Sequence, residues 1–161
     1  SELLAGLRDG EFDVVVSAEK VGEDLYRIER LYEEDYKVVV SKSHPLSELN
    51  TISLSTLAKT DMLDRLNCEM RDALFGTCAD QGHELYAAYR SNRVDWLVEL
   101  ARQGLGAVIL PATAIPSDIG LVSKPIDGLE ISRTVVALRY RHQTTRPETN
   151  DLIREMTRTP A

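Results

Sequence analysis

The stretch from Leu85 to Pro111 restricts the possible folds of this chain more than any other part of it. It opens with a short apolar and aromatic run and closes with a continuous apolar one, and both runs are typical of strands. Gly104 and Gly106 precede the second run, where a helix has to end. Between the runs, apolar residues recur at helical spacing and form one stripe: Val94, Leu97, Val98, Ala101 and Leu105. A strand, helix and strand of this length predict a right-handed βαβ unit.

The ends of the two strands in this unit are the first candidate ligand contacts. Ligands of open α/β sheets bind beyond the carboxyl ends of parallel strands. Ser91 and Asn92 follow the first strand, and Pro111 and Ala112 lie at the end of the second. The first two also offer side-chain oxygens that can cap the helix. No GxSxG motif surrounds Ser91, so a cap is a better interpretation of it than a nucleophile.

Composition and charge argue against several classes of protein. With 161 residues, 43% of them hydrophobic, the chain can bury the core of one ordinary domain or of two small lobes. The net charge of −7 and the lack of a Lys/Arg cluster argue against direct binding of nucleic acid. No apolar run approaches the roughly 20 residues of a membrane span, and no signal-peptide pattern opens the chain. Two cysteines fit a reducing compartment, so we expect a cytoplasmic protein that does not contact membranes.

The remaining elements continue the α/β pattern. Gly10 ends a helix that opens the chain, and a buried strand is expected at 12–16. Because this helix reads as the middle of a domain, we expect the first strand and helix of the domain to be missing. The acidic run 33–35 is interpreted as a solvated edge. The further expected elements are strands at Leu25–Glu34, Lys37–Ser41, Met62–Leu66, Leu121–Ile126 and Thr134–Tyr140, and helices at 53–59, at 68–79 and from Pro147 onward.

The order of these segments resembles the effector-binding domain of LysR-type transcriptional regulators. The segments that carry the resemblance are SELLAGLRDGEFDVVV, KVVVSKSHPLSE, SLSTLA and VELARQGLGAVILP, followed by a strand and a closing helix. The resemblance covers essentially all 161 residues, and HPL followed later by GLGAVILP is its most specific part.

The resemblance implies an α/β fold of two lobes, like that of type 2 periplasmic binding proteins. Two crossover strands would join the lobes, at Lys37–Ser41 and Thr134–Tyr140. Lobe I would comprise residues 1–40 plus 132–161, and lobe II residues 42–130. The domain's own first strand and helix would be missing from this chain.

The resemblance also implies a regulatory domain that senses a small effector and supports oligomerisation, and not an enzyme. Effectors of the family, often anions or aromatic acids, are held between the lobes by helix N-termini and hydroxyls. We expect a homo-oligomer (dimer or tetramer), no cofactor and no metal, with DNA contacted only through a helix-turn-helix domain that is absent from this chain. The effector-binding candidates are Ser17, Asn67, Cys68, Glu69, Ser91, Asn92, Pro111 and Ala112.

Cys68 and Cys78 raise a second hypothesis, a thiol-based redox sensor. The peroxide-sensing branch of the family carries Arg-Asp two residues after its reactive cysteine, and a second cysteine six residues after that Asp. Arg71-Asp72 and Cys78 match this pattern, but Glu69 stands at the reactive position and Cys68 lies one residue too early. If both cysteines lie on one helix, their Cα atoms are about 15 Å apart, beyond the ~7 Å limit of a disulfide. Ordinary small residues are therefore the preferred interpretation.

The sequence is also compatible with two further classes of protein. A solute-binding protein has the same two-lobe architecture, and the absence of an export signal counts against it. A metabolic enzyme on a similar scaffold is disfavoured, because no acid–base pair and no phosphate loop emerge. The three histidines are far apart and show no metal spacing: His44, His83 and His142.

Two smaller features have competing interpretations. The loop 67–69 fits effector contact and a plain N-cap at Asn67 equally well. Trp96 is expected to pack on the flank of its helix rather than to stack on a ligand.

Overall fold

The computed structural model describes residues 1–66, 68–117, 119–129, 131–144 and 146–158. The chain forms two compact units. Unit 1 combines Ser1–Glu34 with the chain from Arg133 onward, and unit 2 is Asp35–Ser132. No helix in the described part of the chain is long and apolar enough to cross a membrane.

Unit 1 is a small antiparallel sheet with two helices. The strand order is β1-β8-β2, and Val16 of β1 pairs with Ala137 of β8. Its core is a cluster of five buried residues: Leu7, Val15, Tyr26, Val136 and Leu138. The elements are α1 (Glu2–Asp9), β1 (Val15–Ser17), the first part of β2 (Tyr26–Ser41), β8 (Ser132–Tyr140) and α5 (Pro147–Arg158).

Strand β2 corrects two expectations from the sequence. The predicted strands Leu25–Glu34 and Lys37–Ser41 are one continuous strand. The acidic run 33–35 is solvated only in part, because Glu33 and Asp35 are exposed whereas Glu34 is buried. Its carboxylate lies 2.7 Å from Arg133, which offsets the cost of burying the charge. The chain passes from one unit to the other inside β2 and again at the start of β8.

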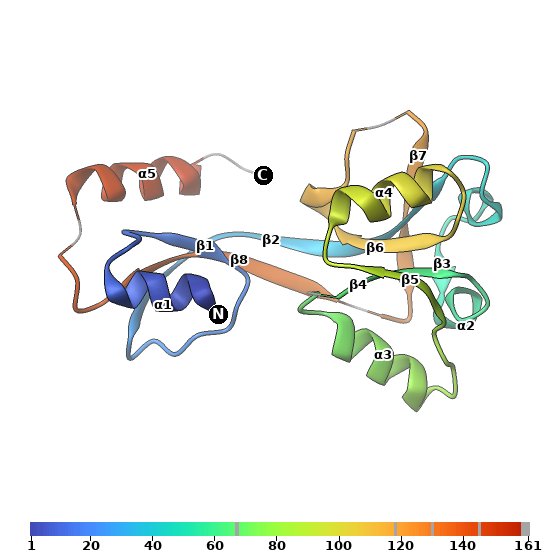
Figure 1. Cartoon of the computed structure of the whole chain (residues 1–161), viewed down its shortest axis with the longest axis horizontal. Coiled ribbons are helices and arrows are strands. Elements are labelled where there is room, and N and C mark those ends of the chain that lie inside the picture. Colours follow the sequence, from blue (N-terminus) through green and yellow to red (C-terminus); the bar gives the residue numbers. More distant parts are fainter. Residues whose placement is uncertain (67, 118, 130, 145, 159–161) are drawn as a thin grey trace. The chain divides into compact units, whose positions relative to one another are not determined.

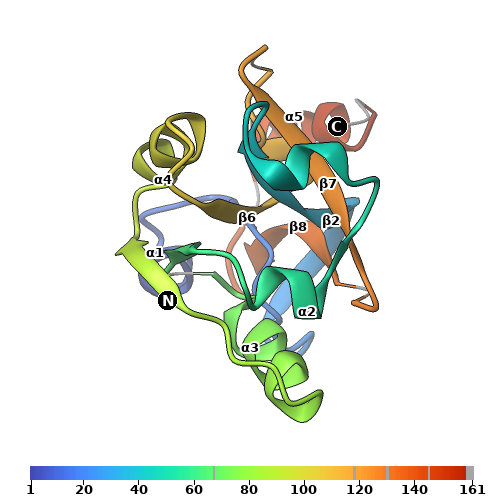
Figure 2. The same cartoon turned by 90° about the vertical axis from the view of Figure 1, so that its right-hand side faces the viewer.

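Unit 2 contains the predicted parallel strands. Strand β6 (Ala107–Pro111) lies between β2, to which it is antiparallel, and β4 (Met62–Arg65), to which it is parallel. Strand β5 (Ala87–Ser91) forms the edge beyond β4, as Figure 2 shows. The remaining elements are η1 (Pro45–Glu48), β3 (Ile52–Ser53), α2 (Leu54–Leu57), α3 (Arg71–Asp80), α4 (Val94–Arg102), η2 (Ala112–Ala114) and β7 (Leu121–Asp127).

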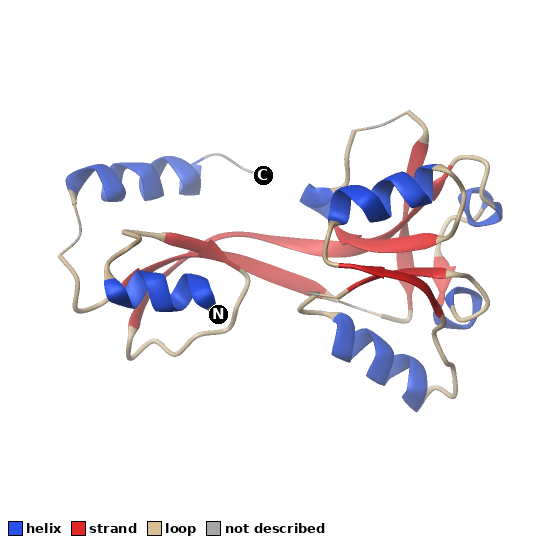
Figure 3. Ribbon diagram, viewed as in Figure 1, coloured by secondary structure: helices blue, strands red, loops and turns tan. Residues whose placement is uncertain are grey.

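Helices cover both faces of the unit 2 sheet (Figures 1 and 3). Helix α4 buries Leu97, Val98 and Ala101 against one face, in a core that includes Leu63 and Leu110. Helices α2 and α3 cover the other face. The core on that side comprises Tyr36, Val38, Val40, Leu46, Ile52, Leu54, Leu57, Met62, Leu74, Cys78, Leu85, Ala107 and Ile109.

The predicted βαβ unit is confirmed as β5, α4 and β6. Its two strands are not neighbours, since β4 lies between them. Gly106 is required where β6 begins, because a Cβ there would lie 2.4 Å from the carbonyl oxygen of Asp61 and the backbone has φ +153°. Leu105 does not continue the buried stripe; it is 44% exposed because the helix has already ended.

Two predicted helix starts were wrong. Helix α4 has Arg93 at its N-cap, and Ser91 is the last residue of β5. Helix α3 begins at Arg71 and not at Cys68, with Met70 at its N-cap. The proposed cap Asn67 lies outside the described residues.

Trp96 also differs from expectation, because 60% of it is exposed. The Arg93 guanidinium lies over its ring, 5.3 Å from the ring centroid.

Candidate functional site

The carboxyl ends of β4 and β5 lie together in unit 2. Arg65 of β4 is in register with Ser91 of β5. The Leu66 N–H donates to the Ser91 carbonyl oxygen at 3.1 Å, so the loop that follows β4 starts beside the end of β5. The Ser91 hydroxyl accepts from the Arg93 N–H at 3.0 Å and thereby closes the turn into α4.

A buried carboxylate connects this edge of the sheet to α3. Asp64 is 5% exposed and accepts from Arg71 Nε at 3.1 and 2.9 Å through its two oxygens. Arg90 of β5 lies 3.5 Å from the same carboxylate. The Arg71 guanidinium also stacks over Phe75, 4.5 Å from the ring centroid. Because Arg71 is the first residue of α3, these contacts decide where that helix begins.

Arg65 and Glu69 form a second ion pair across the loop. Arg65 Nη2 donates to Glu69 Oε2 at 2.9 Å, and the Tyr36 hydroxyl donates to Glu69 Oε1 at 2.5 Å. Burial by itself lowers the pKa of the Arg65 guanidinium. Contacts with Cys68, Glu69 and Tyr36 outweigh that effect and leave the pKa above its ordinary value.

An apolar cavity adjoins this ion pair inside unit 2. Its volume is about 30 Å³, and it is bounded by β2, β4, β6, β7 and α3. Tyr36, Asp64, Arg65, Cys68 and Arg71 supply its polar edge. The apolar lining comes from Met62, Leu63, Met70, Leu74, Phe75, Ile109, Ile126 and Ile131.

The two cysteines have different surroundings. Cys68 is half-buried in the loop between β4 and α3 and lines the cavity. Cys78 is fully buried in the third turn of α3, and burial raises the pKa of its thiol. Both thiols are free.

The structure brings most of the sequence candidates to one edge of unit 2. Cys68 and Glu69 follow β4, Ser91 and Asn92 follow or end β5, and Pro111 and Ala112 lie where β6 meets η2. Pro111 is fully buried, whereas Asn92 is exposed. Ser17 ends β1 in unit 1, where its hydroxyl accepts from the Glu19 N–H at 3.0 Å.

The sequence did not point to three side chains at this edge: Tyr36, Asp64 and Arg65. It pointed to Arg71 only as part of the redox pattern and not as a partner of Asp64. One signal was present for Asp64 and Arg65, because they end a strand whose carboxyl end already carried candidates. Tyr36 gave no such signal, since it lies on another strand and approaches Glu69 only through the fold.

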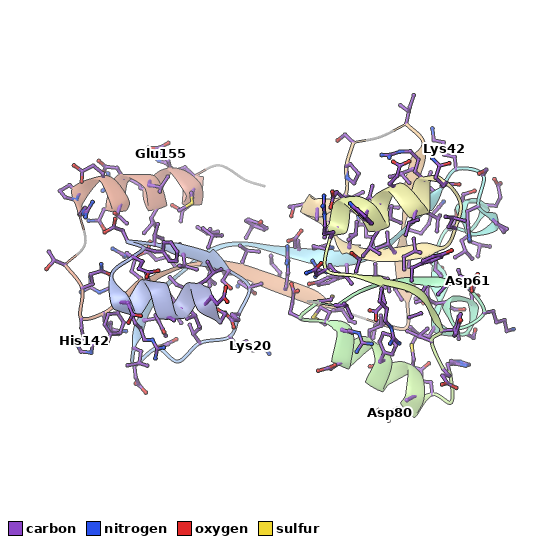
Figure 4. All side chains as sticks on the ribbon, in the orientation of Figure 1. Lys20, Lys42, Asp61, Asp80, His142 and Glu155 are labelled. Carbon is purple, nitrogen blue, oxygen red and sulfur yellow. The ribbon has the colours of Figure 1, made fainter. Side chains whose placement is uncertain are left out.

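His44 does not extend this site. Its ring nitrogen Nδ1 accepts from the Leu46 N–H at 3.1 Å and caps η1, and burial lowers its pKa. Within the described ranges, no group of His, Cys, Asp and Glu side chains could hold a metal ion. Figure 4 shows Asp61 and Asp80 at separate places in unit 2: Asp61 lies just before β4, and Asp80 ends α3.

The chain matches the family model of the LysR substrate-binding domain over residues 1–161. It is 28% identical to the DNA-binding transcriptional dual regulator OxyR of Escherichia coli over 145 residues, which is 87% of this chain and 47% of OxyR. The chain spans about half the length of these curated relatives.

Solved structures match the fold. A reduced form of OxyR from N. meningitidis has a TM-score of 0.76 at 25% identity, covering 97% of this chain and 74% of that one. The effector-binding domain of QuiR, in complex with shikimate, has a TM-score of 0.80 at 16% identity, covering 99% of this chain and 77% of that one.

Proposed function

The chain belongs to the LysR substrate-binding domain family, and we propose its function from that membership. It is the effector-binding domain of a LysR-type regulator, and its role is to sense an effector rather than to catalyse a reaction. We infer that it serves a cytoplasmic, homo-oligomeric regulator and is not an enzyme. DNA would be contacted through a helix-turn-helix domain in another part of the protein.

Unit 1 and unit 2 would be the two lobes of a domain that binds a small effector. The division of the chain supports this proposal, because the chain changes unit inside β2 and at the start of β8. These are the strands on which the two crossovers were expected. An effector that binds one conformation of the domain more tightly than another would shift the equilibrium toward that conformation.

The observation that carries the proposal is the group of polar side chains at the carboxyl ends of β4 and β5. Three arginines at this edge, Arg65, Arg71 and Arg90, outnumber the two carboxylates with which they pair, those of Asp64 and Glu69. Ser91 and Asn92 add polar groups. A small anion is therefore the favoured effector, although the chain as a whole carries −7. Charges farther away than about 8 Å are largely screened, so these local groups decide what binds.

The test uses the intact regulator and Ser91→Phe. A phenyl group at the end of β5 would fill the effector position, whereas the fold should persist because Ser91 lies on an edge strand. We expect the variant to bind promoter DNA normally and to lose its response to the effector. An unchanged midpoint of that response would place the effector elsewhere.

The sequence of the gene upstream of Ser1 separates a regulator from a solute-binding protein. A helix-turn-helix encoded there supports the regulator, and an export signal supports the solute-binding protein.

Thiol-based sensing is the second candidate, favoured by the similarity to OxyR and by Arg71-Asp72 and Cys78. The buried position of Cys78 inside α3 counts against it. Effector binding therefore remains our first proposal.

A further inference from the structure

The carboxylate of Glu69 is held by two donors from other parts of unit 2. The Tyr36 hydroxyl, on β2, donates to one oxygen at 2.5 Å, and Arg65 Nη2, on β4, donates to the other at 2.9 Å. Hydrogen bonds to an ionised acceptor are shorter and stronger than neutral ones. The same two groups would hold the carboxylate of a small acid equally well.

The two donors, Tyr36 and Arg65, are held in place by burial, whereas the acceptor Glu69 is more exposed. Tyr36 is 4% exposed and the Arg65 side chain 12%, whereas the Glu69 side chain is 32% exposed. The donors belong to strands, and Glu69 belongs to the loop between Arg65 and α3. The donor pair is thus a preformed part of the sheet, and the carboxylate that fills it is carried on a separate segment.

The donors also border the apolar cavity, and Glu69 does not. Tyr36 and Arg65 line the cavity of about 30 Å³ together with Cys68. The Nε of Arg65 is buried and, among the described residues, donates to no acceptor. A buried donor without an acceptor costs free energy, so this guanidinium retains capacity for another acceptor.

We propose that Tyr36 and Arg65 form a binding site for a small monocarboxylate, and that Glu69 fills this site from within the chain. An added acid binds only by displacing Glu69, and its short apolar part then enters the cavity. Because Glu69 is tethered, it competes at a high effective concentration. This inference extends the proposed effector site, but it requires neither the effector nor DNA.

The test is a titration with acetate at constant ionic strength, adjusted with sodium chloride and followed by the thermal midpoint of the chain. Glu69→Ala removes the internal carboxylate and should bind acetate about tenfold more tightly than the unaltered chain. Acetamide, which has a similar shape without the charge, should not reproduce the effect. Equal responses of the variant and the unaltered chain, or equal responses to acetate and acetamide, overturn the proposal.

Two further variants make the result specific. Glu69→Ala combined with Arg65→Gln should lose the gain in affinity, since the cationic donor is gone. Glu33→Ala removes a carboxylate from an exposed pair with Arg30 in unit 1 and should respond as the unaltered chain does. A gain in Glu33→Ala, or a gain that survives Arg65→Gln, contradicts the proposed site.

Glu69→Gln covers the case in which Glu69→Ala is unstable. Acetate should restore folding of either variant, because it replaces the missing carboxylate. If neither variant folds at any acetate concentration, the proposal is wrong. Failure here would leave the regulatory function intact, since that function is tested separately by Ser91→Phe and the effector response.

Discussion

Unit 1 and unit 2 are both α/β, but they bury their apolar residues to different extents. Unit 2 covers its sheet with α4 on one face and α2 and α3 on the other, over two large cores. The described part of unit 1 has a single cluster of five buried residues. Several of its large apolar side chains remain substantially exposed: Leu3, Phe12, Val16 and Leu152. Unit 2 also exposes large apolar side chains, among them Tyr86, Trp96 and Ile119. Both units therefore present apolar surface that a partner could cover, and in unit 1 this surface surrounds the smaller core.

The largest expected effect is on the core of unit 2. Leu110→Ala should lower the free energy of unfolding by about 3 kcal/mol, because the side chain is fully buried and its removal leaves a cavity. Leu105→Ala is the matched control: it is the same change a few residues away at an exposed position, and it should cost less than about 0.5 kcal/mol. Urea unfolding measures both. Similar costs for the two variants would show that unit 2 lacks the dense core described.

A smaller effect is expected for the ion pair that fixes the start of α3. Asp64→Asn should cost about 2 kcal/mol, because it weakens the contacts to Arg71 and Arg90 around a buried position. In unit 1, Asp151→Asn alters an exposed pair with Arg154 and should cost almost nothing. If urea unfolding shows the same loss of unfolding free energy for Asp64→Asn and Asp151→Asn, the burial of Asp64 does not strengthen its ion pairs.

The elements predicted well from sequence were those set by local patterns. The stripe of α4 and the apolar run of β6 predicted the βαβ unit because both periodicities are visible along the chain. The helix expected at 53–59 is present as the shorter α2, and the Ser53 hydroxyl caps it by accepting from the Thr56 N–H at 3.2 Å.

What the sequence could not predict depends on partners far along the chain. Strand β2 continues through its acidic run because Glu34 meets Arg133, and α3 starts at Arg71 because that residue meets Asp64 on β4. At the candidate site, the strand ends were predicted from general rules of α/β sheets. The two donors to the Glu69 carboxylate were not predicted, because Tyr36 reaches the loop between β4 and α3 only after β2 has paired with β6.

The exposed apolar side chains of unit 1 lead to a prediction about association. We expect the chain to form dimers or larger species at micromolar concentrations through unit 1. Val16→Lys, on the short strand β1, should weaken this association about tenfold by placing a charge in the contact. Leu49→Lys makes the same change at an exposed position of unit 2 and should not alter it. Light scattering across a concentration series measures the association of both variants. If the unaltered chain is a monomer at every concentration, the exposed apolar side chains of unit 1 do not drive association.

The smallest expected effect is no effect, and it concerns the two thiols of unit 2. Brief exposure of the native chain to hydrogen peroxide should produce no Cys68–Cys78 disulfide, because Cys78 is buried in α3 and Cys68 lies in the loop before it.

The pKa of Cys78 adds a dependence on pH. Burial raises this pKa, so the folded state favours the neutral thiol over the thiolate. The associated stability is present below the ordinary thiol pKa and is lost as the pH rises through the raised one. Unfolding in urea should therefore become easier at alkaline pH, and Cys78→Ala should reduce that dependence.

The test for a Cys68–Cys78 disulfide after peroxide is alkylation of the remaining thiols followed by mass spectrometry. If peroxide forms the bond in the folded chain, α3 opens far more readily than the other elements of unit 2, and thiol sensing replaces effector binding as the leading function.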